Sequence, residues 1–453
     1  MSLKQRRLLF YSFILLFLLI APFALLYATG RTINWSRFEI QKTGSLIIES
    51  EPSNADIFLN DKRPTLFFNQ ILKRNASPKT NTRLTNLAPA NYLLRIELAG
   101  YLPWERKTTV VANEVTHIGP IRLFKDAKPE LQNTLDQKKQ LLISPDGRTV
   151  VSISDTALSV IQIPEQTQFN LTIEKGGKSS IYWSNNQENF VLNDRYIISR
   201  QGEIIVNLRD SLAFQPTFVR WDNDNDYQIY YIEKNRVYRF IFISKKNELV
   251  MDITPLLKTG DLYDYKLDNN HVYFVIKKKP GAEIVVLYPG SPKKQTTATL
   301  PDGTYHFISD AKNKVLLLET QKKELYLLEQ PLPLFFSPRV TLLAKNYAVG
   351  SWNKNKVLYA TPFEIREWDN NHENLISRFG EVIIGLGQLS KNNEILFATK
   401  DSIKILPTSD QIFSQTVNLL SEVEISNVLI INDDNLYFLG NYNNQYGIYK
   451  LDF

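Results

Sequence analysis

The sequence predicts an all-β protein carried on one membrane-spanning helix, with a small β-sandwich followed by an eight-bladed β-propeller. Three observations predict this architecture. A run without charge occupies Leu8 to Tyr27, alternating apolar strands fill residues 44–124, and a unit made of a polar turn and two strands recurs eight times between Leu141 and Phe453. A propeller of seven blades is the alternative, because the copies are divergent.

The N-terminal apolar run has the length of a transmembrane helix. Its 20 residues, Leu8 to Tyr27, are interrupted only by Pro22. At about 1.5 Å per residue such a helix spans about 30 Å, the thickness of a bilayer core. Lys4, Arg6 and Arg7 precede the run. We therefore expect a cytoplasmic N-terminus, with the rest of the chain outside the cytoplasmic membrane.

A cleaved signal peptide is the alternative interpretation of this run. The apolar region of a signal peptide is normally shorter, about 7 to 15 residues, and ends at a small-x-small site. Leu26-Tyr27-Ala28 is a poor match to such a site. We predict a retained anchor and the following division of the chain: 1–7 cytoplasmic stub, 8–28 signal-anchor helix, 29–43 linker, 44–124 sandwich, 125–140 linker or closing strand, and 141–453 propeller.

Residues 44–124 have the pattern of a compact β unit. Residues 45–50 alternate as a strand, Glu51-Pro52-Ser53-Asn54 forms a turn, and residues 55–59 return as a second strand. Residues 92–98 alternate again, and the segments 108–111 and 118–123 follow. This pattern predicts a small β-sandwich.

This unit resembles the PEGA domain, a small β-sandwich of surface proteins. The matching residues, in chain order, are Pro52-Ser53-Asn54-Ala55, Ser77-Pro78, Leu87-Ala88-Pro89-Ala90-Asn91-Tyr92 and Gly100-Tyr101. Ser53, Asn54 and Ala90 depart from the family pattern, and residues 64–75 are an additional stretch. Asn54 can still form the turn because asparagine tolerates positive φ. The resemblance implies a surface-exposed module with a structural or adhesive role and no catalytic residues.

The repeats after Leu141 are spaced like propeller blades. The eight turns are residues 144–148, 184–188, 222–226, 267–270, 309–313, 352–355, 390–393 and 432–435. Their spacing of roughly 37 to 45 residues is the period of a blade. An apolar run rich in β-branched and aromatic residues follows each turn, as in Val272-Tyr273-Phe274-Val275-Ile276. Such runs predict inner strands buried on both faces, stacked around an axis.

The last unit ends at Leu451 without an outer strand of its own. We expect chain before Leu141 to supply that strand, which closes the ring. The segment Ile143-Ser144-Pro145-Asp146-Gly147-Arg148-Thr149-Val150-Val151 resembles the signature of the WD-like repeats in TolB-type propellers. The other seven units keep the turn position and the strand without Pro-Asp-Gly, so the resemblance implies an architecture and transfers no binding residue.

Composition restricts the classes of partner. The 53 basic and 47 acidic residues give a net charge of +6 spread along the chain, which is too dilute for a nucleic-acid surface. The basic clusters at 277–279, 293–294 and 322–323 are interpreted as solvated loops. The absence of cysteine excludes a lipid-modified cysteine anchor and any disulfide framework.

One turn has partial calcium-loop spacing. Asp222, Asp224 and Asp226 occupy positions 1, 3 and 5, with Glu233 at position 12, but Tyr227 stands where the loop needs glycine. This set is a weak metal candidate beside the interpretation as an ordinary Asx-rich turn. The four histidines lie in separate units and have no metal-ligand spacing: His117, His271, His306 and His372.

The sequence has no nucleophile elbow and no glycine-rich phosphate loop. Trp183, Trp221 and Trp352 occupy one position, just before or within a blade turn. Their repetition at that position favours packing between blades over a binding surface. We predict neither a catalytic site nor a cofactor.

The predicted function is binding: a membrane-anchored scaffold or adhesion module of the cell envelope with a protein or envelope-polymer partner. One alternative is a propeller hydrolase acting on envelope glycans or peptides, which an acidic cluster at the central channel would support. A second alternative is a subunit of an envelope or secretion complex, which a broad apolar patch on a blade flank would support.

Overall fold

The computed structural model is nearly all β and divides into two compact units. Unit 1 comprises Met1–Lys128, Ser409–Leu419 and Asp452–Phe453, and unit 2 comprises Pro129–Thr408 and Leu420–Leu451. The structure describes residues 3–34, 39–64, 77–136, 140–154, 157–163, 165–173, 179–222, 225–258, 260–268, 271–287, 295–308, 315–329, 337–352, 356–369, 372–389, 394–407, 416–431 and 434–453. Most of the additional stretch at 64–75 therefore lies outside the described residues.

Unit 1 begins with the expected apolar helix, α1 (Leu3–Ala28), which contains Pro22. Its window Gln5–Pro22 is long and apolar enough to cross a membrane, and none of that window is buried inside the protein. Large apolar side chains from Leu8 to Ile20 are exposed to between 40% and 73%. These side chains therefore have no apolar cover within the described part of the chain.

The segment expected to be a linker contains a β-hairpin. β1 (Arg31–Asn34) pairs antiparallel with β2 (Glu39–Lys42). Gly30 precedes the hairpin at φ +65, a conformation that glycine adopts without strain. Thr43 closes the hairpin base, because its backbone N–H donates to the carbonyl oxygen of Gly30 at 2.9 Å.

Two three-stranded sheets form the rest of unit 1. One has the order β5-β3-β8, with β3 (Gly44–Glu51), β5 (Thr82–Leu87) and β8 (Val115–Arg122), and the other has the order β4-β6-β7, with β4 (Asp56–Leu59), β6 (Ala90–Glu97) and β7 (Trp104–Val110). Leu46 and Ile48 of one sheet and Ile57 and Leu94 of the other are fully buried in one apolar cluster. Asn54 has φ 66, as expected for the turn before β4. The two sheets thus share a single core.

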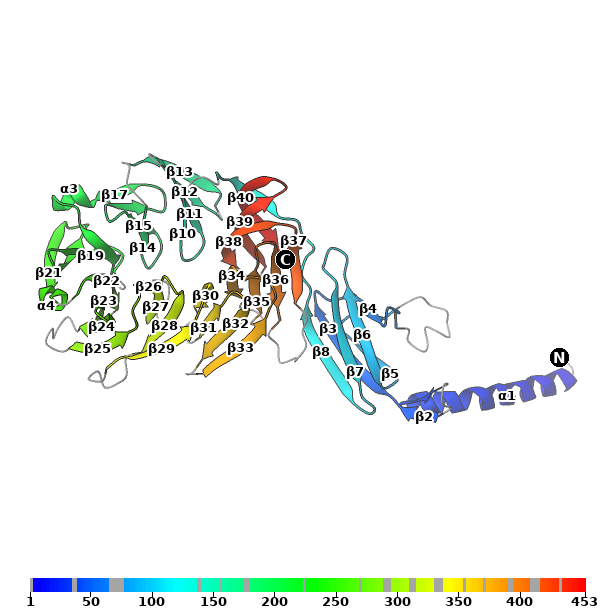
Figure 1. Cartoon of the computed structure of the whole chain (residues 1–453). Coiled ribbons are helices and arrows are strands. Elements are labelled where there is room, and N and C mark those ends of the chain that lie inside the picture. The colour runs from blue at the N-terminus through cyan, green and yellow to red at the C-terminus, as the bar shows by residue number, and fades with distance from the viewer. Residues whose placement is uncertain are drawn as a thin grey trace. The chain divides into compact units, whose positions relative to one another are not determined.

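Unit 2 contains eight four-stranded sheets within the described residues, and the chain forms most of them in sequential order (Figure 1). The first four sheets are made of β10 (Gln140–Ile143), β11 (Thr149–Ile153), β12 (Ala157–Gln162) and β13 (Thr167–Thr172); β14 (Ile181–Trp183), β15 (Asn189–Leu192), β16 (Tyr196–Ser199) and β17 (Ile204–Asn207); β18 (Thr217–Trp221), β19 (Gln228–Glu233), β20 (Arg236–Ile241) and β21 (Lys246–Asp252); and β22 (Leu262–Asp268), β23 (His271–Lys278), β24 (Gly281–Leu287) and β25 (Gln295–Leu300). Two short helices, α3 (Leu208–Leu212) and α4 (Thr254–Leu257), follow β17 and β21.

The next sheets repeat this arrangement. They are made of β26 (Tyr305–Ile308), β27 (Val315–Glu319), β28 (Glu324–Glu329) and β29 (Arg339–Ala344); β30 (Val349–Trp352), β31 (Val357–Ala360), β32 (Glu364–Asp369) and β33 (His372–Arg378); and β34 (Gly385–Gln388), β35 (Ile395–Ala398), β36 (Ser402–Leu406) and β37 (Val417–Ser421). The last sheet joins β38 (Glu424–Ile431), β39 (Asn435–Tyr442) and β40 (Gln445–Asp452) to β9 (Glu130–Thr134). β9 is therefore the outer strand that we expected from chain before Leu141.

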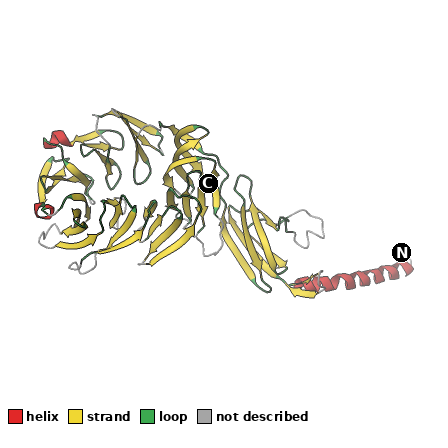
Figure 2. Ribbon diagram, viewed as in Figure 1, coloured by secondary structure: helices red, strands yellow, loops and turns green. Residues whose placement is uncertain are grey.

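Apolar clusters join most neighbouring sheets of unit 2. Tyr231 and Val191 meet in the cluster between the second and third sheets, and Ile161 and Leu439 meet in the cluster between the first sheet and the last. At the contact between the seventh and eighth sheets, a Cβ on Gly385 would lie 2.6 Å from the Val428 side chain, so glycine permits the close approach. Sequential sheets that pack in a closed ring form a β-propeller, as Figure 2 shows for the strands of this unit.

Candidate binding site

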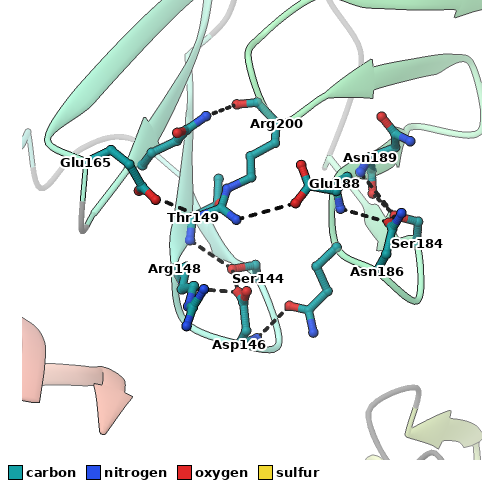
Figure 3. Close-up of polar contacts among 12 residues, drawn as sticks. Ser144, Asp146, Arg148, Thr149, Glu165, Ser184, Asn186, Glu188, Asn189 and Arg200 are labelled. Carbon is teal, nitrogen blue, oxygen red and sulfur yellow. Dashed lines mark hydrogen bonds and ion pairs between the residues drawn. The ribbon is translucent and has the colours of Figure 1, made fainter. Parts of the chain in front are cut away.

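The turn between the first and second strands of the first sheet is held by a serine and an aspartate (Figure 3). The Ser144 hydroxyl donates to Asp146 Oδ1 at 2.6 Å and accepts the backbone N–H of Thr149 at 2.9 Å. Asp146 Oδ1 also accepts the backbone N–H of Arg148 at 3.0 Å. These bonds fix the turn that the Pro-Asp-Gly signature predicts.

The second sheet forms the same turn without that signature. The Ser184 hydroxyl donates to Asn186 Oδ1 at 2.8 Å and accepts the backbone N–H of Asn189 at 3.0 Å. Asn186 Oδ1 also accepts the backbone N–H of Glu188 at 3.0 Å. An amide oxygen thus replaces the carboxylate, which explains how the turn position persists while the sequence diverges. Most of the later turns lie wholly or partly outside the described residues.

Side chains also connect neighbouring turns. The backbone N–H of Asp146 donates to Gln187 Oε1 at 2.8 Å, and the backbone N–H of Asn186 donates to Asp226 Oδ1 at 3.3 Å. Arg200 lies between Glu165 and Glu188, with nitrogen–oxygen distances of 3.7 and 3.9 Å (Figure 3). These contacts tie the turns of the first three sheets into one rim.

A pocket of about 210 Å³ lies beside this rim, where the first strands of the second to fifth sheets come together. Its walls combine aromatic rings, amide side chains of the turns and three charged groups. Residues that line it include Tyr182, Trp183, Asn185, Trp221, Lys266 and Phe307, together with Arg220 and Asp264. Aromatic walls with a few convergent polar groups are typical of ligand sites.

Arg220 and Asp264 form a buried ion pair at the pocket. Arg220 Nη2 donates to Asp264 Oδ1 at 2.6 Å, and the two side chains are 15% and 5% exposed. The Arg220 guanidinium also lies over the Tyr182 ring, 3.8 Å from its centroid. Asp264 accepts the backbone N–H of Phe307 at 3.0 Å and that of Tyr265 at 2.8 Å. One carboxylate therefore connects the first strands of three sheets.

Burial and pairing oppose each other in this ion pair. Burial alone would raise the pKa of the Asp264 carboxyl, but the charge of Arg220 and the hydrogen bonds from His306 and Phe307 outweigh it and hold the pKa below the usual value. Burial alone would lower the pKa of Arg220, and Asp264 raises it instead. Both groups therefore stay charged at neutral pH, and each depends on the other.

The tryptophans support packing, as their repetition predicts. Trp221 Nε1 donates to the carbonyl oxygen of Tyr182 at 2.8 Å, which links the third sheet to the second. Trp183 packs on Phe190 with ring centroids 4.8 Å apart. Both indoles also border the pocket, so packing and a binding surface coincide here. The side chain of Trp352 lies outside the described part of the structure.

Two of the calcium-loop candidates, Asp222 and Glu233, lie at opposite ends of β19. Asp222 accepts a hydrogen bond from Gln228 Nε2 at 2.6 Å, whereas Glu233 stands at the opposite end of β19, opposite Arg236. Asp224 lies outside the described residues. Among those that the structure describes, no group of three His, Asp or Glu side chains could hold a metal ion.

The histidines are also dispersed. In unit 1, His117 Nε2 lies 3.2 Å from Glu49 Oε2. At the pocket, His306 Nδ1 lies 3.6 Å from Asp264 Oδ2. His271 and His372 begin β23 and β33.

Sequence reasoning missed Arg220 and Asp264. A signal was present in each case, because each charged residue interrupts an apolar first strand, as in Val219-Arg220-Trp221 and Tyr263-Asp264-Tyr265. A charge within a buried strand is unusual unless it is paired. Pairing the two, however, requires knowing that their strands are neighbours.

No protein-family model matches this sequence, and no curated protein matches it significantly. Solved structures with some similarity include one described as the eukaryotic initiation factor, at 13% identity over 73% of this chain and 90% of that chain, with a TM-score of 0.44. The C-terminal WD40 domain of Sif2 has 11% identity, 72% and 99% coverage and a TM-score of 0.43. The β-propeller domain of Cps50 (Swd1) from Myceliophteria thermophila has 10% identity, 71% and 99% coverage and a TM-score of 0.39. At these TM-scores the similarity gives no evidence of fold beyond the sheet order described above, and it indicates no ligand for this chain.

Proposed function

We propose that this chain is a membrane-anchored binding protein of the cell envelope, with a protein partner that engages the pocket-bearing rim of the propeller. The single observation that carries the proposal is the pocket itself, which combines aromatic walls with polar groups on first strands that the ring holds rigidly. Rigid positioning lowers the entropy that a binding surface loses on association. Each of the eight sheets is one blade in this proposal.

The exposed helix supports the membrane part of the proposal. Large apolar side chains from Leu8 to Ile20 are exposed within the described structure, and an apolar surface of that size is unfavourable in water. A bilayer would bury it. The basic residues Arg6 and Arg7 favour an N-terminus in the cytoplasm, with residues 29–453 on the other side.

The two-sheet module of unit 1 fits the same proposal as a PEGA-like sandwich. Its shared core and the positive φ of Asn54 are consistent with the turn that this family places there. In this interpretation the module is a structural or adhesive element that lies between the anchor and the propeller in the chain.

Binding is favoured over hydrolysis by the chemistry of the pocket. Asp264 is the one carboxylate among the described lining residues, and Arg220 and two backbone N–H groups already occupy it. Glycoside hydrolysis needs a pair of carboxylates, one of them able to act as an acid. A depressed pKa is the opposite of what a general acid requires.

Site-specific photo-crosslinking tests the proposal. Phe307→p-benzoylphenylalanine places the probe in the pocket wall, and Phe363→p-benzoylphenylalanine places it on a 49% exposed side chain that is not among the lining residues. We expect a defined protein adduct from the Phe307 variant in intact cells and none from the Phe363 variant. An adduct from Phe363 alone would instead favour a complex subunit that binds through a blade flank.

A further inference from the structure

The hairpin β1–β2 lies next to the proposed membrane anchor in the chain. α1 ends at Ala28, and β1 begins at Arg31. Three residues of extended chain reach about 10 Å at most. If α1 spans a bilayer, the hairpin must therefore begin within or near the headgroup layer.

The register of the hairpin gives it two different faces. Arg31 pairs with Lys42 and Ile33 pairs with Ile40, and side chains two apart on a strand share a face. One face therefore carries two cations and two isoleucines. Arg31, Ile40 and Lys42 are exposed and Ile33 is intermediate.

The opposite face carries the pairs Thr32–Gln41 and Asn34–Glu39. Thr32 and Gln41 are half-buried, and Glu39 is exposed. We call the face with Arg31 and Lys42 the outward face, because three of its four side chains are exposed. The carboxylate of Glu39 therefore lies on the face opposite both cations.

Two features of the outward face are unfavourable in water. Like charges directly opposite each other on a hairpin repel, and no ion pair joins Arg31 or Lys42 to any other described side chain. Ile40 is also 60% exposed, which forgoes the gain from burying its apolar surface. Both features become favourable in a headgroup layer, where phosphates neutralise the cations and the acyl boundary covers the isoleucines.

We propose that the β1–β2 hairpin is an interfacial element, in which Arg31 and Lys42 bind the phosphates of anionic phospholipids while Ile33 and Ile40 lie at the acyl boundary. This inference rests on the proposed anchoring by α1. It adds a second membrane contact that the helix alone does not supply.

The contact has a structural consequence for unit 1. The Thr43 hydroxyl and backbone N–H both donate to the carbonyl oxygen of Gly30, at 2.8 and 2.9 Å. The hairpin base is therefore closed, and β3 begins at the next residue, Gly44. The strand that starts the two-sheet module leaves directly from the hairpin, and the hairpin lies within the segment expected to be a linker at 29–43.

Fluorescence quenching at single cysteines tests the proposal, because the chain has no native cysteine. Ile40→Cys and Gln41→Cys are matched neighbours on opposite faces. Each full-length variant carries an environment-sensitive nitrobenzoxadiazole label and is reconstituted in vesicles of phosphatidylcholine and phosphatidylglycerol that contain a spin-labelled lipid. We expect several-fold stronger quenching and a blue-shifted emission for the label at position 40.

Charge removal supplies the second measurement. The pair Arg31→Gln and Lys42→Gln, added to Ile40→Cys, should reduce quenching in the anionic vesicles to the value found in pure phosphatidylcholine. The matched control is Lys258→Gln with Lys345→Gln, which removes two charges from exposed positions in unit 2 and should leave quenching unchanged.

The outcomes separate this inference from the proposed function. Equal quenching at positions 40 and 41 in a chain that resists alkaline carbonate extraction would overturn the interfacial hairpin while leaving the anchor intact. Quenching at position 40 that is insensitive to the loss of both charges would overturn the phosphate contacts. Extraction of the chain by carbonate would overturn the anchor and the hairpin together.

Discussion

Asp264→Ala removes the carboxylate that connects the first strands of three sheets. Arg220, whose side chain is 15% exposed, then keeps its charge without that partner. Breaking a buried pair by removing one member costs about 3–5 kcal/mol, because the remaining charge stays desolvated. The backbone N–H groups of Tyr265 and Phe307 also lose their acceptor. We expect the propeller to lose about 3–5 kcal/mol of unfolding free energy.

Calorimetry of the full-length protein in detergent measures the effect. A loss of 1 kcal/mol lowers the melting temperature of a large domain by roughly 2 °C, so the expected loss corresponds to a fall of about 6–10 °C. Glu424→Gln is the control, because it removes one member of an exposed ion pair. Glu424 Oε1 and Lys400 Nζ lie 4.0 Å apart, and their side chains are 55% and 78% exposed. An exposed pair contributes about 0–1 kcal/mol.

A double substitution distinguishes the pair from general damage to the site. Asp264→Leu with Arg220→Met removes both charges and keeps much of the volume, and such replacements are often neutral or stabilising. We therefore expect the double variant to melt well above Asp264→Ala. If Asp264→Ala melted within the range of the Glu424→Gln control, the assignment of Asp264 as a connection between sheets would be wrong.

Three further predictions concern close packing, turns and pH. A Cβ on Gly260 would lie 1.8 Å from a backbone carbonyl oxygen, whereas nothing lies within 4 Å of a Cβ on Gly380. Gly260→Ala should therefore lower the free energy of unfolding, measured by urea titration, by about 3 kcal/mol, and Gly380→Ala should leave it almost unchanged. Ser144 and Ser184 make equivalent hydrogen bonds in their turns. Ser144→Ala and Ser184→Ala should therefore each lower the free energy of unfolding by about 1 kcal/mol. A difference between the two variants well above about 1 kcal/mol would contradict the equivalence of the turns. Hydrogen bonds from a neighbouring lysine and arginine lower the pKa of Glu248 to about 2. Its contribution to stability is therefore complete above the unfolded pKa of about 4.3 and is lost as the pH falls toward 2, which carboxyl NMR and acid titration would detect.

Local sequence patterns predicted the propeller because each repeat carries its own turn and strand. The serine-centred bonds at Ser144 and Ser184 are short-range, and their residues lie within five positions of each other. The outer strand of the last sheet was also predictable, since the last repeat supplies three strands, β38 to β40, where the other repeats supply four. β9 supplies that partner.

The pocket was not predictable in the same way. Arg220 and Asp264 are 44 residues apart, and a charge inside an apolar run gives no indication of which partner it meets. The hairpin within 29–43 was missed for another reason. Its strands have four residues each, which is too short for alternation to separate them from a linker.

In the proposed orientation α1 crosses the membrane, and residues 29–453 lie on its outer side. Single cysteines test this orientation, because Ser2→Cys and Asp302→Cys each introduce the one thiol of a chain that otherwise has none. A membrane-impermeant maleimide is added to intact cells, or to spheroplasts if an outer membrane is present, and again after lysis. We expect the cysteine at 302 to be labelled before lysis and the cysteine at 2 only afterwards. Labelling in the reverse order, or labelling of the cysteine at 302 only after lysis, would contradict the proposed orientation and the envelope function with it.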